Sequence, residues 1–593
     1  MEASAFQFSQ LAFSSGSKYL FLSLKERGKK YSENEIPGRG PMKRILVTSA
    51  LPYINNLPHL GNIIGSHLPA DVFARFCRLK GFDVVFIGGT DENGSPTEVA
   101  AFRIGKSPKE FCDEFYEKHK KIYEWFGISY DCFSRTSNKT NNETTKEIFL
   151  KIFKIGFISK RKILLPYCDN CKRYLPDRWI EGTCPYCGYI GARGDQCDKC
   201  TRLLDPENLK EPYCVICREK PEFKQVEHLF FDLDKLEPKL RKWIEKNKHW
   251  KPNVRNFALG WLDEGLKPRC ITRNLEWGIH IPLKEFENLV FYCWFDAPIG
   301  YISSTKDWAI KTKKPDEWRK YWLNKDTKIY HFLGKDNIIF HTIIWPAIII
   351  AHGRFNLPYQ VCGLEYLNYE GDKFSKSRDH GIFIDFLDND IKVRCGDKYL
   401  DFEPDIWRFY LISIMPETKD SDFKWKDFED KINNELVANL GNFIFRTLSF
   451  IHKNFDSVVP KPMNFDKSDK EIIKEIEKTP ERVEKAILDL RFKDSLKELM
   501  KLSDLGNKYF QIKKPWETIK TDTDKCKTTL YICANMVASL AVLIEPYLPF
   551  ACEKLLKQLN LKRQKWDSAK QLLIKSGHKI SKPEILFRKV EVS

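Results

Sequence analysis

Four C-x2-C pairs are the residues of this 593-residue chain whose spacing most directly predicts chemistry. The eight cysteines fall within fifty residues: Cys168, Cys171, Cys184, Cys187, Cys197, Cys200, Cys214 and Cys217. Thiolates paired in this way bind zinc, whereas disulfide frameworks are typical of small secreted chains. The short inner spacing favours two nested sites, one made by the two inner pairs and one by the two outer pairs. Sequential pairing, with the first two pairs in one site, is the alternative.

A second set of residues predicts an anion-binding turn. His59-Leu60-Gly61-Asn62 lies between an apolar run and a segment with helical spacing of apolar residues. The first turn of a helix favours an anion through its backbone N–H groups and its dipole. Gly61 would let a phosphate or a flat base approach the backbone, and His59 can donate a hydrogen bond to phosphate. Alone, such a segment is more often only a helix cap.

A third set of residues is cationic. Lys373-Phe374-Ser375-Lys376-Ser377-Arg378 follows a strand-like run late in the chain. Two ammonium groups separated by small hydroxyl residues suit a loop that closes over a substrate and stabilises the charge on a pyrophosphate leaving group. A lone run of Lys and Ser is more often solvated surface, so this segment by itself is only a weak indication of a phosphate site.

The elements that must position these residues can be predicted from periodicity. Residues 45–49 and 84–87 read as strands on either side of a helix whose apolar positions run from 64 to 79. Further strands are expected at 328–334 and 359–364. Such a pattern predicts a parallel sheet that binds ligands at the carboxyl ends of its strands. Beyond residue 422, long helical segments at 432–450 and 529–548 predict an all-α domain.

Charge and targeting signals bound the function further. The chain has 98 Lys and Arg against 81 Asp and Glu, a net charge of +17, which favours a polyanionic partner. After Cys552 there are eleven basic and four acidic residues. Residues 1–41 contain several acids, which argues against a transit peptide, and no convincing signal peptide is present. The apolar segment 531–550 contains two prolines and a glutamate, so a buried bundle helix is expected there and no membrane association.

In this order, and separated by a cysteine-rich insertion, the two phosphate-binding segments resemble the signatures of class I aminoacyl-tRNA synthetases. The family forms are H-I-G-H and K-M-S-K-S, and the chain has Asn62 in place of the second histidine and Phe374 in place of methionine. Residues 50–56, 89–91, 295–301 and 334–341 resemble the methionyl-tRNA synthetases, and the resemblance spans about residues 42–516. It implies a Rossmann-like α/β catalytic domain with parallel strands, an inserted zinc-binding connective domain and an all-α anticodon-binding bundle.

The resemblance also implies site residues. The methionine side chain is expected among Leu51, Tyr53, Trp294, Ala297, Pro298, Tyr301 and His341, with Asp91 at the ammonium group. The residues expected at ATP are His59, Gly61, Asn62, Lys335, Asp336, Lys373, Ser375 and Lys376. The catalytic roles are assigned to His59, Asn62, Lys373, Lys376 and Arg273. The residues expected to read the anticodon are Asn442, Arg446 and Trp516.

The implied domain boundaries follow the changes in composition. Residues 1–41 form an extension that is expected to be disordered, 42–155 and 271–370 are the two halves of the catalytic domain, and 156–270 is the connective domain. Residues 371–430 carry the KFSKS loop and a stem-contact region, 431–560 form the anticodon-binding bundle, and 561–593 form a basic tail.

The implied activity is activation of L-methionine with ATP and transfer to tRNA(Met), both elongator and initiator. Mg²⁺ is expected with ATP, two Zn²⁺ ions are expected in structural sites, and a cytoplasmic monomer is favoured, with organelle targeting by residues 1–41 left open. Two alternatives remain. One is a degenerate paralogue that binds tRNA without activating an amino acid. The other is a different class I synthetase, notably a cysteinyl enzyme, in which a metal binds the substrate thiol.

Overall fold

We describe the fold from a computed structural model of the chain, which describes residues 43–200, 202, 204–374, 380–387 and 390–592. The chain divides into two units, Met1–Lys43 and Arg44–Ser593, and the fold below is that of the second. The predicted N-terminal extension and the residues Ser375 and Lys376 lie outside the described residues.

A five-stranded parallel sheet forms the centre of the catalytic region, in the order β14-β13-β1-β2-β3. The strands are β1 (Arg44–Ser49), β2 (Asp83–Thr90), β3 (Cys132–Arg135), β13 (Lys328–Gly334) and β14 (Gln360–Leu364). The chain leaves β1 in one direction towards β2 and returns on its other side at β13. In a doubly wound sheet this reversal of strand order opens a crevice at the carboxyl ends of the two central strands. The sequence-based prediction of the sheet is confirmed.

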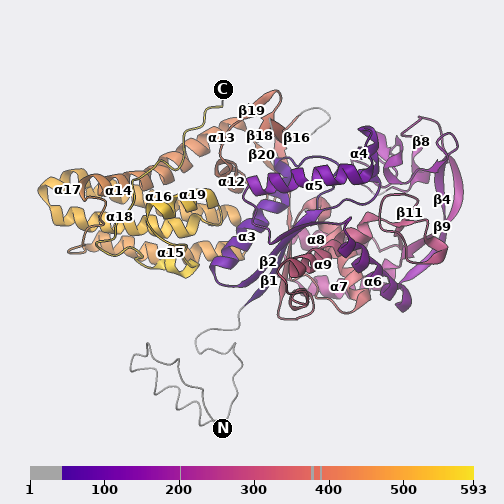
Figure 1. Ribbon diagram of the computed structural model, residues 1–593, viewed down its shortest axis with the longest axis horizontal. Helices are drawn as coiled ribbons and strands as arrows, with labels where there is room; N and C mark the ends of the chain where they lie inside the picture. Colours follow the sequence, from indigo (N-terminus) through magenta and orange to yellow (C-terminus); the bar gives the residue numbers. More distant parts are fainter. Residues whose placement is uncertain (1–42, 201, 203, 375–379, 388–389, 593) are drawn as a thin grey trace, which may run out of the picture. The chain divides into compact units, whose positions relative to one another are not determined.

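Helices cover both faces of this sheet (Figure 1). Because successive residues of a strand point to opposite faces, Ile45 and Val47 belong to one apolar cluster and Leu46 to another. The first cluster includes α3 (Leu68–Leu79) and the second includes α9 (Cys293–Lys311). The helix expected over residues 64–79 begins earlier, as a short α-helical turn, α2 (Leu60–Asn62), followed by a π-helical turn, η1 (Ile63–His67).

The insertion consists of two small antiparallel sheets. The long strands β4 (Ile158–Cys168) and β9 (Glu222–Phe231) pair along almost their whole length and form the stem. The second sheet has the order β7-β6-β8, with β6 (Ile180–Thr183), β7 (Ile190–Arg193) and β8 (Lys210–Cys214). After β9 the helices α7 (Glu237–Lys246) and α8 (Pro252–Asp263) pack into the apolar cluster of the central sheet.

Residues 367–423 link the central sheet to the helical region. One small sheet has the order β16-β15-β20, with β15 (Leu367–Tyr369), β16 (Asp372–Lys373) and β20 (Ser421–Phe423). Another contains β17 (Phe383–Leu387), β18 (Asp390–Cys395) and β19 (Lys398–Leu400). Helix α12 (Pro404–Ser413) is buried between them and the helices that follow.

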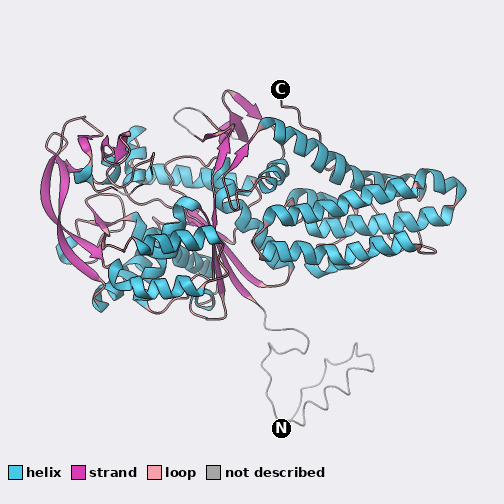
Figure 2. Ribbon diagram, turned by 180° about the vertical axis from the view of Figure 1, so that it is seen from behind, coloured by secondary structure: helices cyan, strands magenta, loops and turns pink. Residues whose placement is uncertain are grey.

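The all-α region is a bundle whose long helices lie side by side in both views (Figures 1 and 2). Its helices are α13 (Trp425–Lys431), η9 (Ile432–Gly441), α14 (Asn442–Asn454), α15 (Lys467–Leu488), α16 (Phe492–Lys513), α17 (Pro515–Thr521), α18 (Thr523–Ile544) and α19 (Pro549–Gln558). Among the described residues, α18 alone is long and apolar enough to cross a membrane, but 89% of that stretch is buried inside the protein. It is therefore the central helix of the bundle, as expected.

The C-terminal segment packs along the bundle. Trp566, Ile574, Leu586 and Phe587 are buried in the same apolar cluster as the helices. Asn433 on η9 accepts a hydrogen bond from the backbone of Val590 at 2.9 Å and donates one to its carbonyl at 2.8 Å. The basic residues of this segment therefore lie on a stretch of chain that is packed against the bundle.

Candidate active site

A cavity of about 430 Å³ lies at the crevice predicted between β1 and β13. It brings together most of the residues that the sequence suggested. The predicted residues that line it are Leu51, Tyr53, His59, Asn62, Asp91, Trp294, Ala297, Pro298, Tyr301, Asp336 and His341. This volume is within the usual range of small-molecule sites. Segments separated by almost three hundred residues therefore form one pocket.

The His59 turn is held in shape by its own side chains. The backbone N–H of His59 donates to Oδ1 of Asn62 at 3.0 Å. The imidazole lies over Gly61, where an added Cβ would come within 2.8 Å of the ring, so a larger residue would displace the His59 side chain. Phe374 stacks on the same imidazole, with the ring centroids 5.1 Å apart. Phe374 also lines the cavity, and residues 375–379, which follow it, lie outside the described residues.

Two buried carboxylates make one wall of the cavity region strongly acidic. Asp91 follows β2, and its Oδ1 is buried without a hydrogen-bond partner. Burial, then Asp296 and Glu92, raise the pKa of Asp91 well above its usual value. Burial also raises the pKa of Asp296 to about 7, although Asn93 donates to it at 2.7 Å. Because a desolvated carboxylate is stabilised by a cation, this wall favours a positively charged ligand group.

The opposite wall is neutral and aromatic. The hydroxyl of Tyr301 bonds Nε2 of His341 at 2.7 Å, and Nδ1 of His341 lies 2.9 Å from the carbonyl oxygen of Asn337. A carbonyl can only accept, so Nδ1 carries the proton and Nε2 accepts from the tyrosine. Burial lowers the pKa of His341 to about 4, which keeps the ring neutral. Tyr53 contacts Cys293 instead, with its hydroxyl oxygen 3.7 Å from Sγ.

Three of the side chains predicted to bind ATP or support its phosphates do not line this cavity. Lys335 forms ion pairs with Glu365 at 3.0 Å and with Asp420 at 2.7 Å. Lys373 is exposed on β16, with its Nζ 5.5 Å from the ring of Tyr366. The third, Arg273, lies in a neighbouring cavity.

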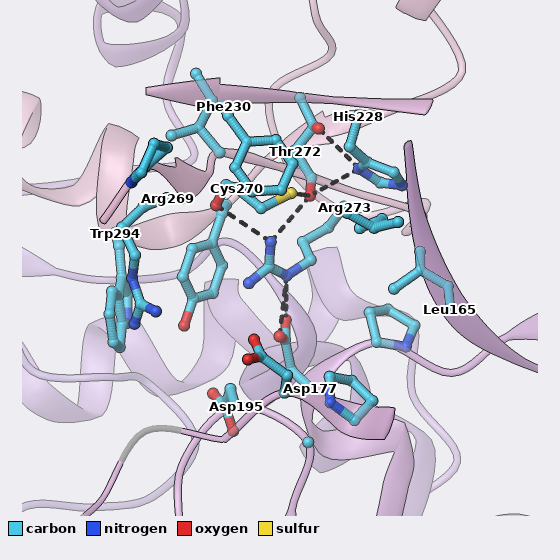
Figure 3. A pocket seen from close by; sticks show the side chains of 18 of the residues that line it. Leu165, Asp177, Asp195, His228, Phe230, Arg269, Cys270, Thr272, Arg273 and Trp294 are labelled. Carbon is cyan, nitrogen blue, oxygen red and sulfur yellow. Dashed lines mark hydrogen bonds and ion pairs between the residues drawn. The ribbon is translucent and has the colours of Figure 1, made fainter. Parts of the chain in front are cut away.

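That neighbouring cavity, of about 490 Å³, shares Asp195 and Trp294 with the first (Figure 3). In it, Nε of Arg273 lies 2.9 Å from both carboxylate oxygens of Asp177, and the guanidinium group is 3.7 Å from the centre of the Tyr292 ring. Burial lowers the pKa of Arg273, but Asp177, Cys270 and Tyr292 together raise it above its usual value. The structure therefore places Arg273 beside the candidate active site and pairs it with an acid.

Several residues of the first cavity carried no sequence signal. Arg178 lies inside the cysteine-rich insertion, where no motif marks it, and Cys293 resembles an ordinary core residue. Asp296 stands in the recognised segment 295–301, next to Ala297 and Pro298. Its burial beside Asp91 appears only when α9 packs against β2.

The cysteines form two separate clusters. One contains Cys168, Cys171, Cys214 and Cys217, and the other contains Cys184, Cys187, Cys197 and Cys200. Within each cluster, the sulfur atoms of cysteines from different C-x2-C pairs are 3.4 to 3.9 Å apart. Sulfur atoms around a tetrahedral zinc ion at about 2.3 Å are about 3.8 Å apart, so the donor sets fit such an ion. The nested grouping is confirmed, and the sequential one is not found.

The predicted anticodon-reading residues lie on two helices of the bundle. Arg446, on α14, has its guanidinium 4.8 Å from the ring centre of Phe510 and 5.9 Å from that of Trp516. Asn442 begins the same helix and is exposed. Trp516 stands at the start of α17 and is half-buried. The structure thus brings the arginine and the tryptophan together.

Comparisons with known proteins agree with this geometry. The family model described as tRNA synthetases class I (M) matches residues 45–448, and the anticodon binding domain of methionyl tRNA ligase matches residues 459–593. The chain is 47% identical over 563 residues to the methionine–tRNA ligase of Pyrococcus furiosus, covering 92% of this chain and 76% of that protein. It is 43% identical over 559 residues to the probable cytoplasmic methionine–tRNA ligase of Dictyostelium discoideum, covering 93% and 74% of the two chains.

A solved structure shows the same fold. Mycobacterium tuberculosis methionyl-tRNA synthetase in complex with methionyl-adenylate superposes with a TM-score of 0.74 at 25% identity, covering 92% of this chain and all of that one. Together with the sheet topology, the cavity at its centre and the helical C-terminal region, these matches show that the chain belongs to the methionyl-tRNA synthetase family of class I aminoacyl-tRNA synthetases.

Proposed function

We propose that the chain is a methionine–tRNA ligase. It activates L-methionine with ATP to methionyl-adenylate and pyrophosphate, and then transfers methionine to the 3′-terminal ribose of tRNA(Met). The observation that carries this proposal is the central cavity, in which a buried acidic wall, an aromatic wall and the His59 turn meet. The membership of the family and the match to a structure with methionyl-adenylate support it.

Methionine fits the cavity in one direction. Its ammonium group would bind Asp91, whose buried Oδ1 lacks a partner among the described residues. Its side chain would lie among Leu51, Tyr53, Trp294, Ala297, Pro298, Tyr301 and His341. Contacts between sulfur and aromatic rings are worth about 0.3 to 1.5 kcal/mol each and favour the thioether over an aliphatic chain. The Tyr301 hydroxyl uses its proton on His341, so an oxygen lone pair is what it can offer a ligand.

ATP would bind at the opposite end. His59, Gly61 and Asn62 would hold its phosphates, Asp336 would contact the adenosine, and the loop that begins at Lys373 would close over the pyrophosphate with Ser375 and Lys376. Lys335 supports this end through its ion pairs, and Arg273 reaches phosphate only by leaving Asp177. ATP is expected as its Mg²⁺ complex, whose cation neutralises phosphate charge.

The reaction needs no protein nucleophile. A carboxylate oxygen of methionine attacks the α-phosphorus, the bond to the β-phosphate oxygen breaks, and pyrophosphate leaves with both electrons. The ribose hydroxyl then attacks the carbonyl carbon, the ester bond forms, and AMP leaves while the hydroxyl proton passes to water or to AMP. The protein contributes by positioning the groups and stabilising charge, which is the main source of catalysis in such transfers.

The remaining residues serve the RNA substrate and the fold. We propose that Asn442, Arg446 and Trp516 read the anticodon, because an aromatic ring beside hydrogen-bonding and cationic groups suits unstacked bases. The two cysteine clusters would each hold one Zn²⁺. Four thiolates leave no open coordination position, so the ions would stabilise the insertion and take no part in the reaction.

Amino-acid-dependent exchange of pyrophosphate into ATP tests this function. We expect exchange with methionine and none above background with cysteine or leucine. Exchange that does not depend on methionine, or none with a preparation that is folded by calorimetry, would contradict the proposal. Strong exchange with cysteine would instead support the cysteinyl alternative.

A further inference from the structure

Three buried acids lie together where β2 ends and α9 begins, and they differ in their partners. Asp91 and Glu92 follow β2, and Asp296 is in the first turn of α9. Asp91 is 5% exposed and lines the active-site cavity, whereas Glu92 and Asp296 are fully buried and do not line it. Glu92 forms an ion pair with Arg135 at 2.9 Å and accepts a hydrogen bond from the hydroxyl of Thr90 at 2.6 Å. One of the three acids thus has its own cation.

The other two acids, Asp91 and Asp296, have no cation among the residues that the structure describes. Neither forms an ion pair there, and the Oδ1 atom of each is buried without a hydrogen-bond partner. The side-chain amide of Asn93 donates to Oδ2 of Asp296 at 2.7 Å, but an amide supplies no net charge. The backbone of Asp91 is fixed on both sides, since its N–H donates to Pro52 and its carbonyl accepts from Ile54. The two carboxyl groups are therefore held in one desolvated region.

The groups around this pair do not supply the missing positive charge. Three arginines of the region interact with other acids: Arg135 with Glu92, Arg273 with Asp177 and Arg178 with Asp195. Burial raises the pKa of the nearby hydroxyl and thiol groups, so they are neutral at pH 7: Tyr53, Cys112 of α5 (Pro108–Trp125), and Cys293 and Tyr301 of α9. Burial also lowers the pKa of His331 and His341, which pack against Tyr301 and are neutral as well.

The Asp91–Asp296 pair retains a proton near neutral pH for a physical reason. Two carboxyl groups in one buried region do not readily ionise together, because desolvation and mutual repulsion both oppose the second charge. Burial and then Asp296 raise the pKa of Asp91 well above its usual value, and burial raises that of Asp296 to about 7. Neighbouring acids of this kind titrate as a unit. A cation that enters the cavity beside Asp91 changes this balance in favour of the carboxylate.

We propose that Asp91 and Asp296 hold a proton before methionine binds, and that the methionine ammonium group displaces it to solvent. The inference rests on the proposed function, because it takes that ammonium group as the ligand of Asp91. The O–H bond of the carboxyl group breaks, its electron pair stays on the carboxylate oxygen that meets the ammonium group, and the proton passes to water. Asp296 does not line the cavity, so it is a positioning residue that acts through Asp91. A ligand without an ammonium group meets an uncharged acid and gains no ion pair.

Proton counting by calorimetry tests the proposal. Binding of methionine to the zinc-loaded full chain is measured in two buffers that differ in their ionisation enthalpy. At about pH 6.5 we expect about one proton to be released per methionine, and the apparent Kd should fall by up to about tenfold per pH unit between about pH 5.5 and 7. L-Methioninol, which has the ammonium group but no carboxylate, should release as much. The deaminated analogue of methionine, which has no ammonium group, should release none.

Variants of the two acids assign the proton. Asp296→Asn keeps the size of the side chain and an oxygen that can accept from Asn93, but it removes one acid. The release should fall to roughly half or less, and the Kd for methionine should depend less on pH. Asp91→Asn should release none, and Asp326→Asn, on an exposed turn, should match wild type. If Asp296→Asn does not fold, difference infrared spectra of wild type give a second measurement, in which methionine should remove the C=O stretch of a protonated carboxyl group.

Two results would overturn the proposal. One is methionine binding to wild type with no proton release and no loss of a protonated carboxyl band, which would show that the pair is already ionised. The other is equal release by wild type and Asp296→Asn, which would remove Asp296 from this role. Pyrophosphate exchange separates these results from a failure of the proposed function: wild type without methionine-dependent exchange refutes that function, whereas exchange without proton release refutes this inference alone.

Discussion

At the scale of single residues, the pocket combines groups whose pKa values are shifted in opposite directions by the same cause. Burial makes the carboxylates Asp91 and Asp296 harder to ionise, and it makes His341 and His331 harder to protonate. The histidine side of the pocket is therefore neutral near pH 7, and the acidic side is poised to gain from a cation. An amino acid with a free ammonium group and an uncharged side chain fits both sides.

The first prediction concerns Asp91. Asp91→Asn should lower the kcat/KM for methionine in pyrophosphate exchange by roughly 10- to 100-fold, since a hydrogen bond between charged groups is worth about 1.5 to 3 kcal/mol. The melting temperature should not fall, because the change removes a buried carboxylate that has no partner for Oδ1. Asp326→Asn, on an exposed turn, is the control. Unchanged methionine kinetics would exclude Asp91 from the ammonium site.

The second prediction concerns pH. The pKa of Asp296 is raised to about 7 in the folded chain, from an ordinary value of 3.8, by burial. Between pH 4 and 7 the folded state therefore keeps a proton that the unfolded state releases. The contribution of Asp296 to the free energy of unfolding is thus greatest below pH 4 and is lost as the pH rises to 7. Asp296→Asn should remove this dependence, at most about 1.4 kcal/mol per pH unit. The free energies of unfolding of the two proteins are measured with urea across this range. The wild-type value minus the variant value should fall as the pH rises, and a difference that does not change with pH would contradict the prediction.

At the scale of elements, each group of functional residues is held in place by a different local structure. The His59 turn relies on Gly61 beneath the imidazole and on the Asn62 side chain. The inner and outer cysteine clusters use short turns at the ends of strands, with β4 and β8 each ending at a ligand cysteine. The anticodon-reading candidates use the close approach of α14, α16 and α17.

Zinc content of paired cysteine variants provides the third prediction. Cys184→Ser/Cys197→Ser damages one nested site, so the purified protein should keep one of two zinc ions; sequential sites would leave none. Cys168→Ser/Cys184→Ser damages both nested sites and should leave none, whereas sequential sites would leave one. Metal analysis by mass spectrometry distinguishes the two patterns, and the unmodified chain should contain two ions.

The fourth prediction separates the two ends of the molecule. Trp516→Ala should preserve methionine-dependent pyrophosphate exchange and lower the kcat/KM for aminoacylation of tRNA(Met) by roughly 10-fold or more, because stacking on one base is worth about 1 to 3 kcal/mol. Trp516→Phe keeps an aromatic ring next to Arg446 and should lose less. Equal losses of exchange and aminoacylation would count against an anticodon role.

At the scale of the whole Arg44–Ser593 unit, one buried arginine joins several regions. Arg408 of α12 is fully buried and pairs with Asp71 of α3 at 2.8 Å. It also donates to the carbonyl oxygens of Phe126, which follows α5, and of Pro546 and Tyr547, which connect α18 to α19. The central sheet's helices and the bundle are thus tied at a single guanidinium group.

The fifth prediction follows from this contact. Arg408→Leu leaves three carbonyl oxygens without this donor and leaves the buried Asp71 with only Arg75 and Ser129, so it should lower the free energy of unfolding by about 3 to 5 kcal/mol. The double variant Asp71→Asn/Arg408→Leu should lose less than the sum of the single losses. Lys557→Gln, which removes an exposed lysine that pairs with the exposed Glu553, is the control and should cost about 1 kcal/mol or less. Calorimetry measures all four, and additive losses would contradict direct coupling.

Much of the fold could be predicted from local pattern. Strands at 45–49, 84–87 and 328–334 have runs of β-branched and apolar residues, which suit only a sheet covered on both faces, and the structure has them as expected. The cysteine clusters were grouped by spacing, because ligands ten residues apart close a compact site readily. The helix expected from residue 64 actually begins at Leu60 and contains a π-helical turn at Ile63–His67, a feature that apolar periodicity does not encode.

The partners of the charged residues could not be predicted in this way. The sequence by itself determined the strands, the helices, the cysteine pairs and the two signature segments, since each depends on residues close together in the chain. Only the tertiary structure decided that Arg273 binds Asp177 beside the main cavity, that the Tyr301 hydroxyl donates a hydrogen bond to His341, and that Asp296 is buried beside Asp91. These outcomes depend on which side chains meet after distant segments pack, and on how much water that packing removes.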